Sequence, residues 1–137
     1  MPQRVLIIDD EEDARLMISA IATAAGLETV EAKDGREALD ILQHDADFAL
    51  IICDKMMPRV EGPEVIRYIR GDARLKDIPV IMSTADRTTQ NLGGVMLDEK
   101  THFVNKASGA DNMRRGIFRA LGFDPEDKET REIPTFT

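Results

Sequence analysis

Five short apolar runs alternate with stretches of helical spacing along the 137-residue chain, and this alternation constrains the fold more than any other feature. The runs are mostly rich in β-branched residues and bounded by polar ones, as strands are; they occupy residues 5–8, 27–32, 48–53, 78–82 and 102–104. Parallel neighbouring strands need a crossover connection, which is usually a helix. The order therefore predicts an α/β fold in which helices cover both faces of a doubly wound, five-stranded parallel sheet.

Apolar residues between these runs recur at the spacing of one helix face. The clearest groups are Ala14, Met17, Ile18, Ile21 and Ala25; Ala38, Ile41 and Leu42; Val65, Ile66 and Ile69; and Met113, Ile117, Ala120 and Leu121. Gly26 and Gly122 follow helix ends. Asp34 and Asp111 are expected to cap the second and the last helix. A further helix is expected over residues 88–99, although a glycine pair in its middle weakens it by about 1 kcal/mol per glycine.

Composition and charge argue against several classes of protein. With 42% apolar residues, we expect one globular domain over residues 1–123 and an acidic tail over residues 124–137. No apolar run approaches the roughly 20 residues that span a bilayer and no leader opens the chain, so a cytoplasmic protein without a membrane partner is expected. The net charge of −8 repels phosphate backbones, which argues against a nucleic-acid partner. The single Cys53 and two distant histidines offer no zinc-type ligand spacing.

Polar and charged residues stand at the carboxyl ends of four of the predicted strands. They are Asp9 and Asp10, Asp54, Thr84, and Asn105 with Lys106. In open parallel sheets, ligands bind beyond the carboxyl ends of the strands, at the crevice where the strand order reverses. We therefore expect these side chains to converge on one rim of the sheet.

Three of these residues are acids, and their mutual repulsion must be compensated. At a separation of about 4 to 5 Å, each pair of carboxylates repels by roughly 4 kcal/mol at an effective dielectric constant near 20. Either one or two of the acids take up protons, or a divalent cation lies among them, and an all-oxygen cluster suits Mg²⁺. We favour the metal because Asp54 stands at the carboxyl end of one predicted strand, just as Asp9 and Asp10 stand at the carboxyl end of another. The acids at residues 11–13 are interpreted differently, as stabilising the N-terminus of the following helix.

Four segments, taken in order, resemble the receiver domain of two-component response regulators. They are VLIIDD, LIICDKMMP, IMSTA and FVNK, with Met57, Pro58 and Gly62 following Asp54, and the resemblance extends over residues 4–122. It implies a flavodoxin-like fold with strand order 2-1-3-4-5. It also implies a single-domain, chemotaxis-type regulator that acts through protein contacts.

The resemblance assigns a Mg²⁺ site to the acids. Asp10 would bind the cation directly, Asp9 mostly through water, and Asp54 and the backbone carbonyl of Met56 would complete the protein ligands. The sulfur of Met56 is not expected to bind the metal. The cofactor implied by the family is therefore Mg²⁺.

The resemblance also assigns the groups that handle phosphate. Asp54 would be the phosphoacceptor, Lys106 the cation that faces the phosphoryl oxygens, and Thr84 the hydroxyl that bonds one of them. A carboxylate is a weak nucleophile, so catalysis of the transfer must come from positioning and charge. The Thr84 hydroxyl is also placed to cap the following helix, and the two roles compete. Phe103 occupies the aromatic switch position.

The function implied is signalling rather than enzymatic turnover. A sensor histidine kinase or a histidine phosphotransfer protein would phosphorylate Asp54, and the phosphorylated form would bind a protein partner through the face formed by residues 86–121. Only slow self-dephosphorylation is expected. Two alternatives stay open: a Mg²⁺-dependent phosphatase of the haloacid dehalogenase type with Asp9 as nucleophile, and a pseudo-receiver that is a scaffold without phosphorylation.

Three positions depart from the family pattern or bear on the lifetime of the phosphate. Ala107 follows Lys106 where the family usually has proline, and because a cis bond before a non-proline residue costs about 3 kcal/mol, a trans bond is expected. Hydrolysis of the phosphorylated Asp54 needs a positioned water. Met56 cannot orient that water and the charge of Asp86 suits it poorly, so a long-lived phosphorylated state is predicted.

Overall fold

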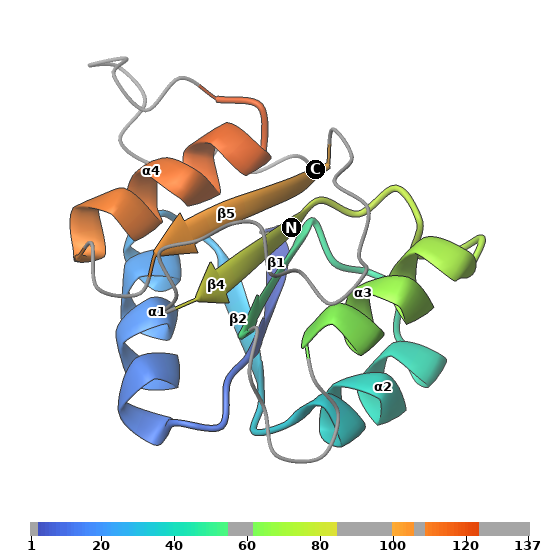
Figure 1. Cartoon of the computed structure of the whole chain (residues 1–137). Coiled ribbons are helices and arrows are strands. Elements are labelled where there is room, and N and C mark those ends of the chain that lie inside the picture. Colours follow the sequence, from blue (N-terminus) through green and yellow to red (C-terminus); the bar gives the residue numbers. More distant parts are fainter. Residues whose placement is uncertain (1–2, 55–61, 85–99, 106–108, 124–137) are drawn as a thin grey trace.

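Strands and helices alternate along the chain as the sequence predicts. The structure is a computed structural model, and it describes residues 3–54, 62–84, 100–105 and 109–123 (Figure 1). The elements are β1 (Arg4–Ile8), α1 (Glu12–Ala24), β2 (Glu28–Ala32), α2 (Gly35–His44), β3 (Leu50–Asp54), α3 (Gly62–Gly71), β4 (Val80–Thr84), β5 (Thr101–Asn105) and α4 (Ala110–Ala120). Within these ranges, no helix has both the length and the apolar character needed to cross a membrane.

The strands form one parallel sheet in the order β2-β1-β3-β4-β5, which confirms the predicted topology. Strand order reverses between β1 and β3, the position at which open α/β sheets bind their ligands. In the register, Ile8 at the end of β1 lies opposite Ala32 on one side and Cys53 on the other. The strands therefore end at one common edge, and whatever follows them meets there.

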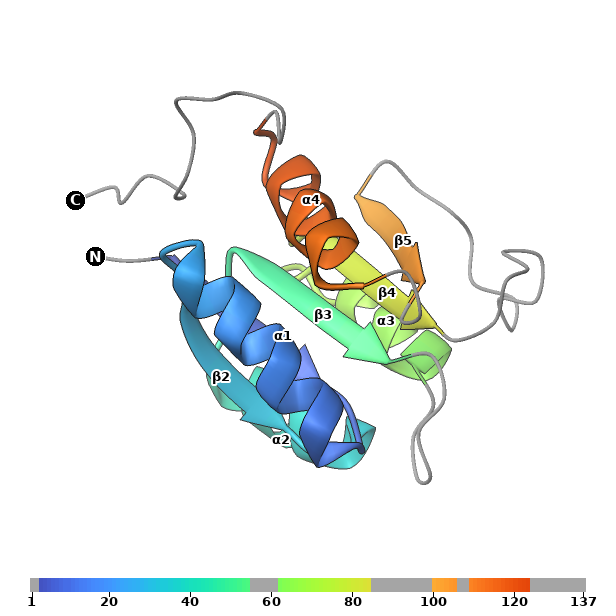
Figure 2. The same cartoon turned by 90° about the vertical axis from the view of Figure 1, so that its left-hand side faces the viewer.

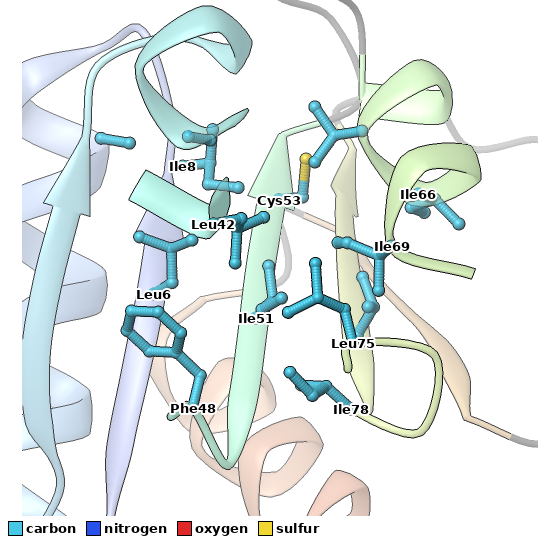
Figure 3. Packing of buried hydrophobic residues seen from close by; sticks show 14 of the residues in the cluster. Leu6, Ile8, Leu42, Phe48, Ile51, Cys53, Ile66, Ile69, Leu75 and Ile78 are labelled. Atoms are coloured by element: carbon cyan, nitrogen blue, oxygen red, sulfur yellow. The ribbon is translucent and has the colours of Figure 1, made fainter. Parts of the chain in front are cut away.

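Helices cover both faces of the sheet, with α1 and α4 on one side and α2 and α3 on the other (Figures 1 and 2). Successive strand residues point to opposite faces. On β1 and β3 the residues that pack with the α2/α3 layer are Leu6, Ile8, Ile51 and Cys53. Figure 3 shows them together with buried side chains of α2 and α3 from the same cluster. Those that pack with the α1/α4 layer are Val5, Ile7, Leu50 and Ile52. By the same alternation, Asp54 follows Ile52 onto the α1/α4 face.

Helix ends agree with the predicted signals at three positions. Gly26 and Gly122 have φ of 92° and 86°, a conformation that side chains disfavour. The amide after each glycine donates back to a carbonyl of the last helical turn, at 3.0 Å after Gly26 and 2.8 Å after Gly122, as in a Schellman motif. Asp34 caps α2, because its Oδ1 accepts a 2.8 Å hydrogen bond from the Glu37 amide. Of these ends, the one at Gly26 lies between α1 and β2, where the chain turns back toward the sheet.

The predicted cap at Asp111 is wrong. The N-cap of α4 is Gly109, with φ of 95°, and Asp111 lies in the first turn of the helix. There its carboxylate pairs with Arg115 at 2.9 Å and with Arg114 at 3.4 Å, so the side chain faces along the helix instead of back over its end. The helix expected over residues 88–99 and the tail expected over residues 124–137 lie outside the residues that the structure describes.

Candidate functional site

Three carboxylates meet at the common edge of the sheet. Asp9 and Asp10 follow β1, and Asp54 ends the neighbouring β3. Each contributes one carboxylate oxygen to a group in which all the oxygens lie within 4.8 Å of one another. Asp9 and Asp54 are buried, at 1% and 5% exposure, whereas Asp10 is exposed. The convergence predicted from the sequence is thus present for these acids.

The backbone and side chain of Asp9 are held at three points. Its amide donates to the Ala32 carbonyl of β2 at 3.1 Å, which extends the sheet bonding past the end of β1. Its Oδ1 accepts a 2.9 Å hydrogen bond from the amide of Glu11, the N-cap residue of α1. Its carbonyl accepts a 2.7 Å hydrogen bond from Nη1 of Arg15. The acid is therefore fixed in both main chain and side chain.

Arg15 is a site residue that sequence reasoning missed. It projects from α1, and besides the Asp9 carbonyl it reaches Glu31 near the end of β2, with 3.4 Å between Nε and Oε1. Its side chain is only 17% exposed. Arg15 on α1 contacts both the residue that follows β1 and a residue of β2. Only the order of the strands, with β2 beside β1, would have suggested these two contacts.

The charges of the cluster fit a divalent cation. At 4.8 Å and an effective dielectric constant near 20, two carboxylates repel by about 3.5 kcal/mol. Every donor is a carboxylate oxygen, the hard ligand that Mg²⁺ prefers, and the exposure of Asp10 leaves one side of the cluster open to water. The donor set therefore suits Mg²⁺ with water completing the coordination.

Cys53 lies beside the cluster in sequence but takes no part in it. Its side chain is fully buried in the α2/α3 layer, on the face of the sheet opposite to that of Asp54. Burial, and then the negative charges of Asp54 and Asp9, raise the pKa of its thiol far above the ordinary value. Cys53 is therefore a core residue, and its thiol is a poor nucleophile or metal ligand.

The ends of β4 and β5 reach the same edge as the acids. Thr84 ends β4 and pairs in register with Asn105, which ends β5. Phe103 is half-buried and packs against the α2/α3 core cluster. The assignments to Met56 and Lys106, the Lys106–Ala107 bond, Asp86 and residues 86–99 and 106–108 of the predicted face over residues 86–121 fall outside the described residues and stay predictions.

Ser83 is a second residue of the site that the sequence did not suggest. It lies opposite Asp54 in the sheet register and is 0% exposed. Its hydroxyl makes no hydrogen bond with any of the described residues. A buried hydroxyl without a partner is destabilising by about 1 to 3 kcal/mol, so its place opposite Asp54 calls for a reason such as a role at the site.

Comparison with known proteins gives a consistent result. The response regulator receiver domain model matches residues 5–118. The polar-differentiation response regulator DivK of Brucella anthropi is 38% identical over 86 residues, which cover 62% of this chain and 68% of DivK. The response regulator MprA of Mycolicibacterium vanbaalenii is 35% identical over 96 residues, which cover 69% of this chain but only 40% of MprA.

Solved structures agree with the sequence comparisons. The chemotaxis response regulator CheY4 of Vibrio cholerae superposes with a TM-score of 0.78 at 30% identity, covering 88% of this chain and all of CheY4. The residues matched by the family model include Asp9, Asp10 and Asp54 at the edge where the acids converge.

Proposed function

Because this chain belongs to the response regulator receiver domain family, we propose that it is the phosphoacceptor of a two-component phosphorelay and that Asp54 takes up the phosphoryl group. One observation carries the assignment to Asp54: its carboxylate ends β3 among the oxygens of Asp9 and Asp10, all within 4.8 Å. Of the three acids, Asp54 stands on the central strand of the sheet. This central position supports Asp54 as the acceptor.

The oxygens of Asp9, Asp10 and Asp54, with the carbonyl of Met56, would hold Mg²⁺. When bound, the cation neutralises charge on the phosphoryl oxygens and on the acids themselves. The rigid hold on Asp9 supports this role, because a ligand that is already fixed loses little freedom on binding.

The protein's own groups would position the transfer. One oxygen of the Asp54 carboxylate forms a bond to phosphorus as the bond between phosphorus and the donor's histidine nitrogen breaks, and the imidazole leaves with the electron pair. Lys106 would neutralise the phosphoryl oxygens, and Thr84 would donate a hydrogen bond to one of them. The end of β4 lies beside β3 in the register, which supports the assignment of Thr84.

Signalling would follow from the new charge at Asp54. A phosphoryl group adds a charge of about −1.5 to −2 and three acceptor oxygens, which Thr84 and Phe103 would report to the face formed by residues 86–121. The phosphodonor is a sensor histidine kinase or a histidine phosphotransfer protein, and the readout is a protein partner in the cytoplasm. The chain would lose its phosphate slowly and catalyse no other reaction.

The rival functions have less support. For a phosphatase that uses Asp9 as nucleophile, the match over residues 5–118 to the response regulator receiver domain gives no support, and Oδ1 of Asp9 already accepts a hydrogen bond from the Glu11 amide. The pseudo-receiver differs from our proposal only in lacking phosphorylation, so one experiment separates all three.

That experiment is intact-mass measurement after incubation with acetyl phosphate and Mg²⁺. We expect the wild type to gain the mass of one phosphoryl group, Asp54→Asn to gain none, and Asp9→Asn to gain it more slowly. Loss of the adduct in Asp9→Asn with retention in Asp54→Asn would favour the phosphatase. No adduct on the wild type, with Mg²⁺ shown to bind, would favour the scaffold.

A further inference from the structure

Arg15 connects three elements beside the acid cluster. Its Nη1 donates a 2.7 Å hydrogen bond to the carbonyl of Asp9, and its Nε lies 3.4 Å from Oε1 of Glu31. The side chain is 17% exposed, so its guanidinium is largely shielded from water. Hydrogen bonds from a charged donor are stronger than neutral ones, and the planar guanidinium fixes the direction of both contacts.

The carbonyl that Arg15 binds belongs to the peptide that joins Asp9 to Asp10. On its other side, Asp9 is tied to β2 through the hydrogen bond from its amide to the Ala32 carbonyl. The two contacts together fix the main chain at Asp9. Asp10 comes next, is exposed, and takes the direction of its side chain from this peptide.

Repulsion among the acids acts against this arrangement. The chain has left β1 at Asp9, so the simplest relief is a rotation of the Asp9–Asp10 peptide that carries Asp10 away from Asp54. Such a rotation would break the hydrogen bond from Arg15 to the Asp9 carbonyl. Arg15 therefore opposes the movement that would disperse the cluster.

The charge and the geometry of Arg15 have opposite effects on a cation. As a positive charge near the acids, Arg15 repels Mg²⁺, so its removal should tighten binding if charge were its only effect. As a clamp on the peptide, it pre-arranges the ligands, so its removal should weaken binding. The sign of the change in affinity distinguishes the two roles.

We propose that Arg15 is a positioning residue that holds the Asp9–Asp10 peptide in the orientation that Mg²⁺ binding requires. The proposal rests on the proposed function, because it presupposes the Mg²⁺ site. In this proposal Arg15 acts through the main chain of Asp9 and is not itself a ligand of the cation.

The test compares Arg15→Met and Arg15→Lys with the wild type, and uses Arg36→Met as the matched control. Arg36 is 72% exposed on α2 and pairs weakly with Asp40 at 4.0 Å, so Arg36→Met removes the same charge from a solvated side chain. Mg²⁺ affinity is measured from amide chemical shifts during a MgCl₂ titration. The rate of phosphorylation by acetyl phosphate is then followed as a function of Mg²⁺ concentration.

We expect Arg15→Met to raise the Mg²⁺ Kd about tenfold, the usual effect of removing a group that orients a metal ligand. Arg15→Lys should have a smaller effect in the same direction, because one ammonium cannot reproduce the fixed pair of contacts. Saturating Mg²⁺ should restore the rate of phosphorylation in both variants, and Arg36→Met should match the wild type. Circular dichroism checks the fold, and Arg15→Lys carries the test if Arg15→Met does not fold.

Two results would overturn the positioning role. One is unchanged or tighter Mg²⁺ binding in Arg15→Met, and the other is a rate in Arg15→Lys that stays low at saturating Mg²⁺. A wild type that neither binds Mg²⁺ nor accepts phosphate would instead refute the proposed function, and the positioning role with it.

Discussion

The substitution Asp54→Asn should stabilise the protein in the absence of Mg²⁺, because it removes one charge from a repelling cluster while keeping the shape of the side chain. Asp54 and Asp9 are both buried and have oxygens within 4.8 Å, so at an effective dielectric constant near 20 they repel by about 3.5 kcal/mol. The pair with exposed Asp10 is screened by water and adds about 0.9 kcal/mol at a dielectric constant near 80. Nearby cations such as Arg15 offset part of this sum.

We therefore expect the free energy of unfolding of Asp54→Asn to rise by about 2 kcal/mol, or Tm by about 6 °C for a domain of this size. Mg²⁺ stabilises the form that binds it, so it should raise the Tm of the wild type more than that of the variant, and the gap should close. The assay is thermal unfolding followed by circular dichroism at low ionic strength, with and without millimolar MgCl₂. Asp40→Asn, which removes a charge from an exposed side chain of α2, is the control and should change little. A variant no more stable than the wild type without Mg²⁺, or a gap that Mg²⁺ leaves unchanged, would refute the reasoning.

Other predictions test the packing, the pH dependence and the phosphate lifetime. Gly116→Ala should lower the free energy of unfolding by about 1 to 3 kcal/mol in urea, because its Cβ would lie 2.6 Å from a β5 methyl group. Gly71→Ala meets no atom within 4 Å and should be neutral or stabilising. The pKa of Asp45 is lowered by a backbone hydrogen bond from Asp47 and by Arg4. Its contribution to the free energy of unfolding is therefore present above the ordinary pKa of 3.8 and is lost as the pH falls through the lowered pKa. Asp45→Asn should therefore destabilise at pH 7, with a difference from wild type that disappears in acid unfolding. From the sequence, Met56→Asn should speed loss of phosphate from the purified phosphoprotein, because asparagine can orient the attacking water and methionine cannot, and an equal or slower rate would contradict this reasoning.

The sequence predicted the strands well but placed the starts of three of them too early, by one residue for β2 and by two residues for β3 and β4. The run over residues 48–53 begins with Phe48, yet β3 starts at Leu50. Phe48 is buried because it packs into the α2/α3 core cluster, with Arg4 over its ring at 4.7 Å, while its amide donates a hydrogen bond to the Ala46 carbonyl in a turn. An apolar run indicates that its residues are buried, but it does not indicate whether a buried residue lies within the strand or just before it.

Helix faces were predicted less securely than strands. Met17 has the spacing of the inward face of α1, but it is 40% exposed, whereas Ala22, absent from the predicted set, is fully buried. An alanine beside the sheet lets the helix approach closely, and a long side chain at the margin of the face can turn toward water. The spacing of apolar residues gives the direction of the buried helix face to within about one position. Packing against the neighbouring helix then decides which residues at the margin of that face are buried.

The acids of the site were predictable because their position follows from topology alone, whereas their supports were not. In a parallel sheet, any residue just past a strand belongs to the carboxyl edge, so Asp9, Asp10 and Asp54 needed only the strand pattern and the strand order. Arg15 and Ser83 are ordinary in sequence, since an arginine on a helix is usually solvated and a serine within a strand is usually packing. What marks them is a bond to one particular carbonyl and a buried hydroxyl with no partner among the described residues, and both depend on how the layers pack. Thus the ligands of such a site are encoded by order along the chain, and the groups that hold those ligands in place are encoded by tertiary structure.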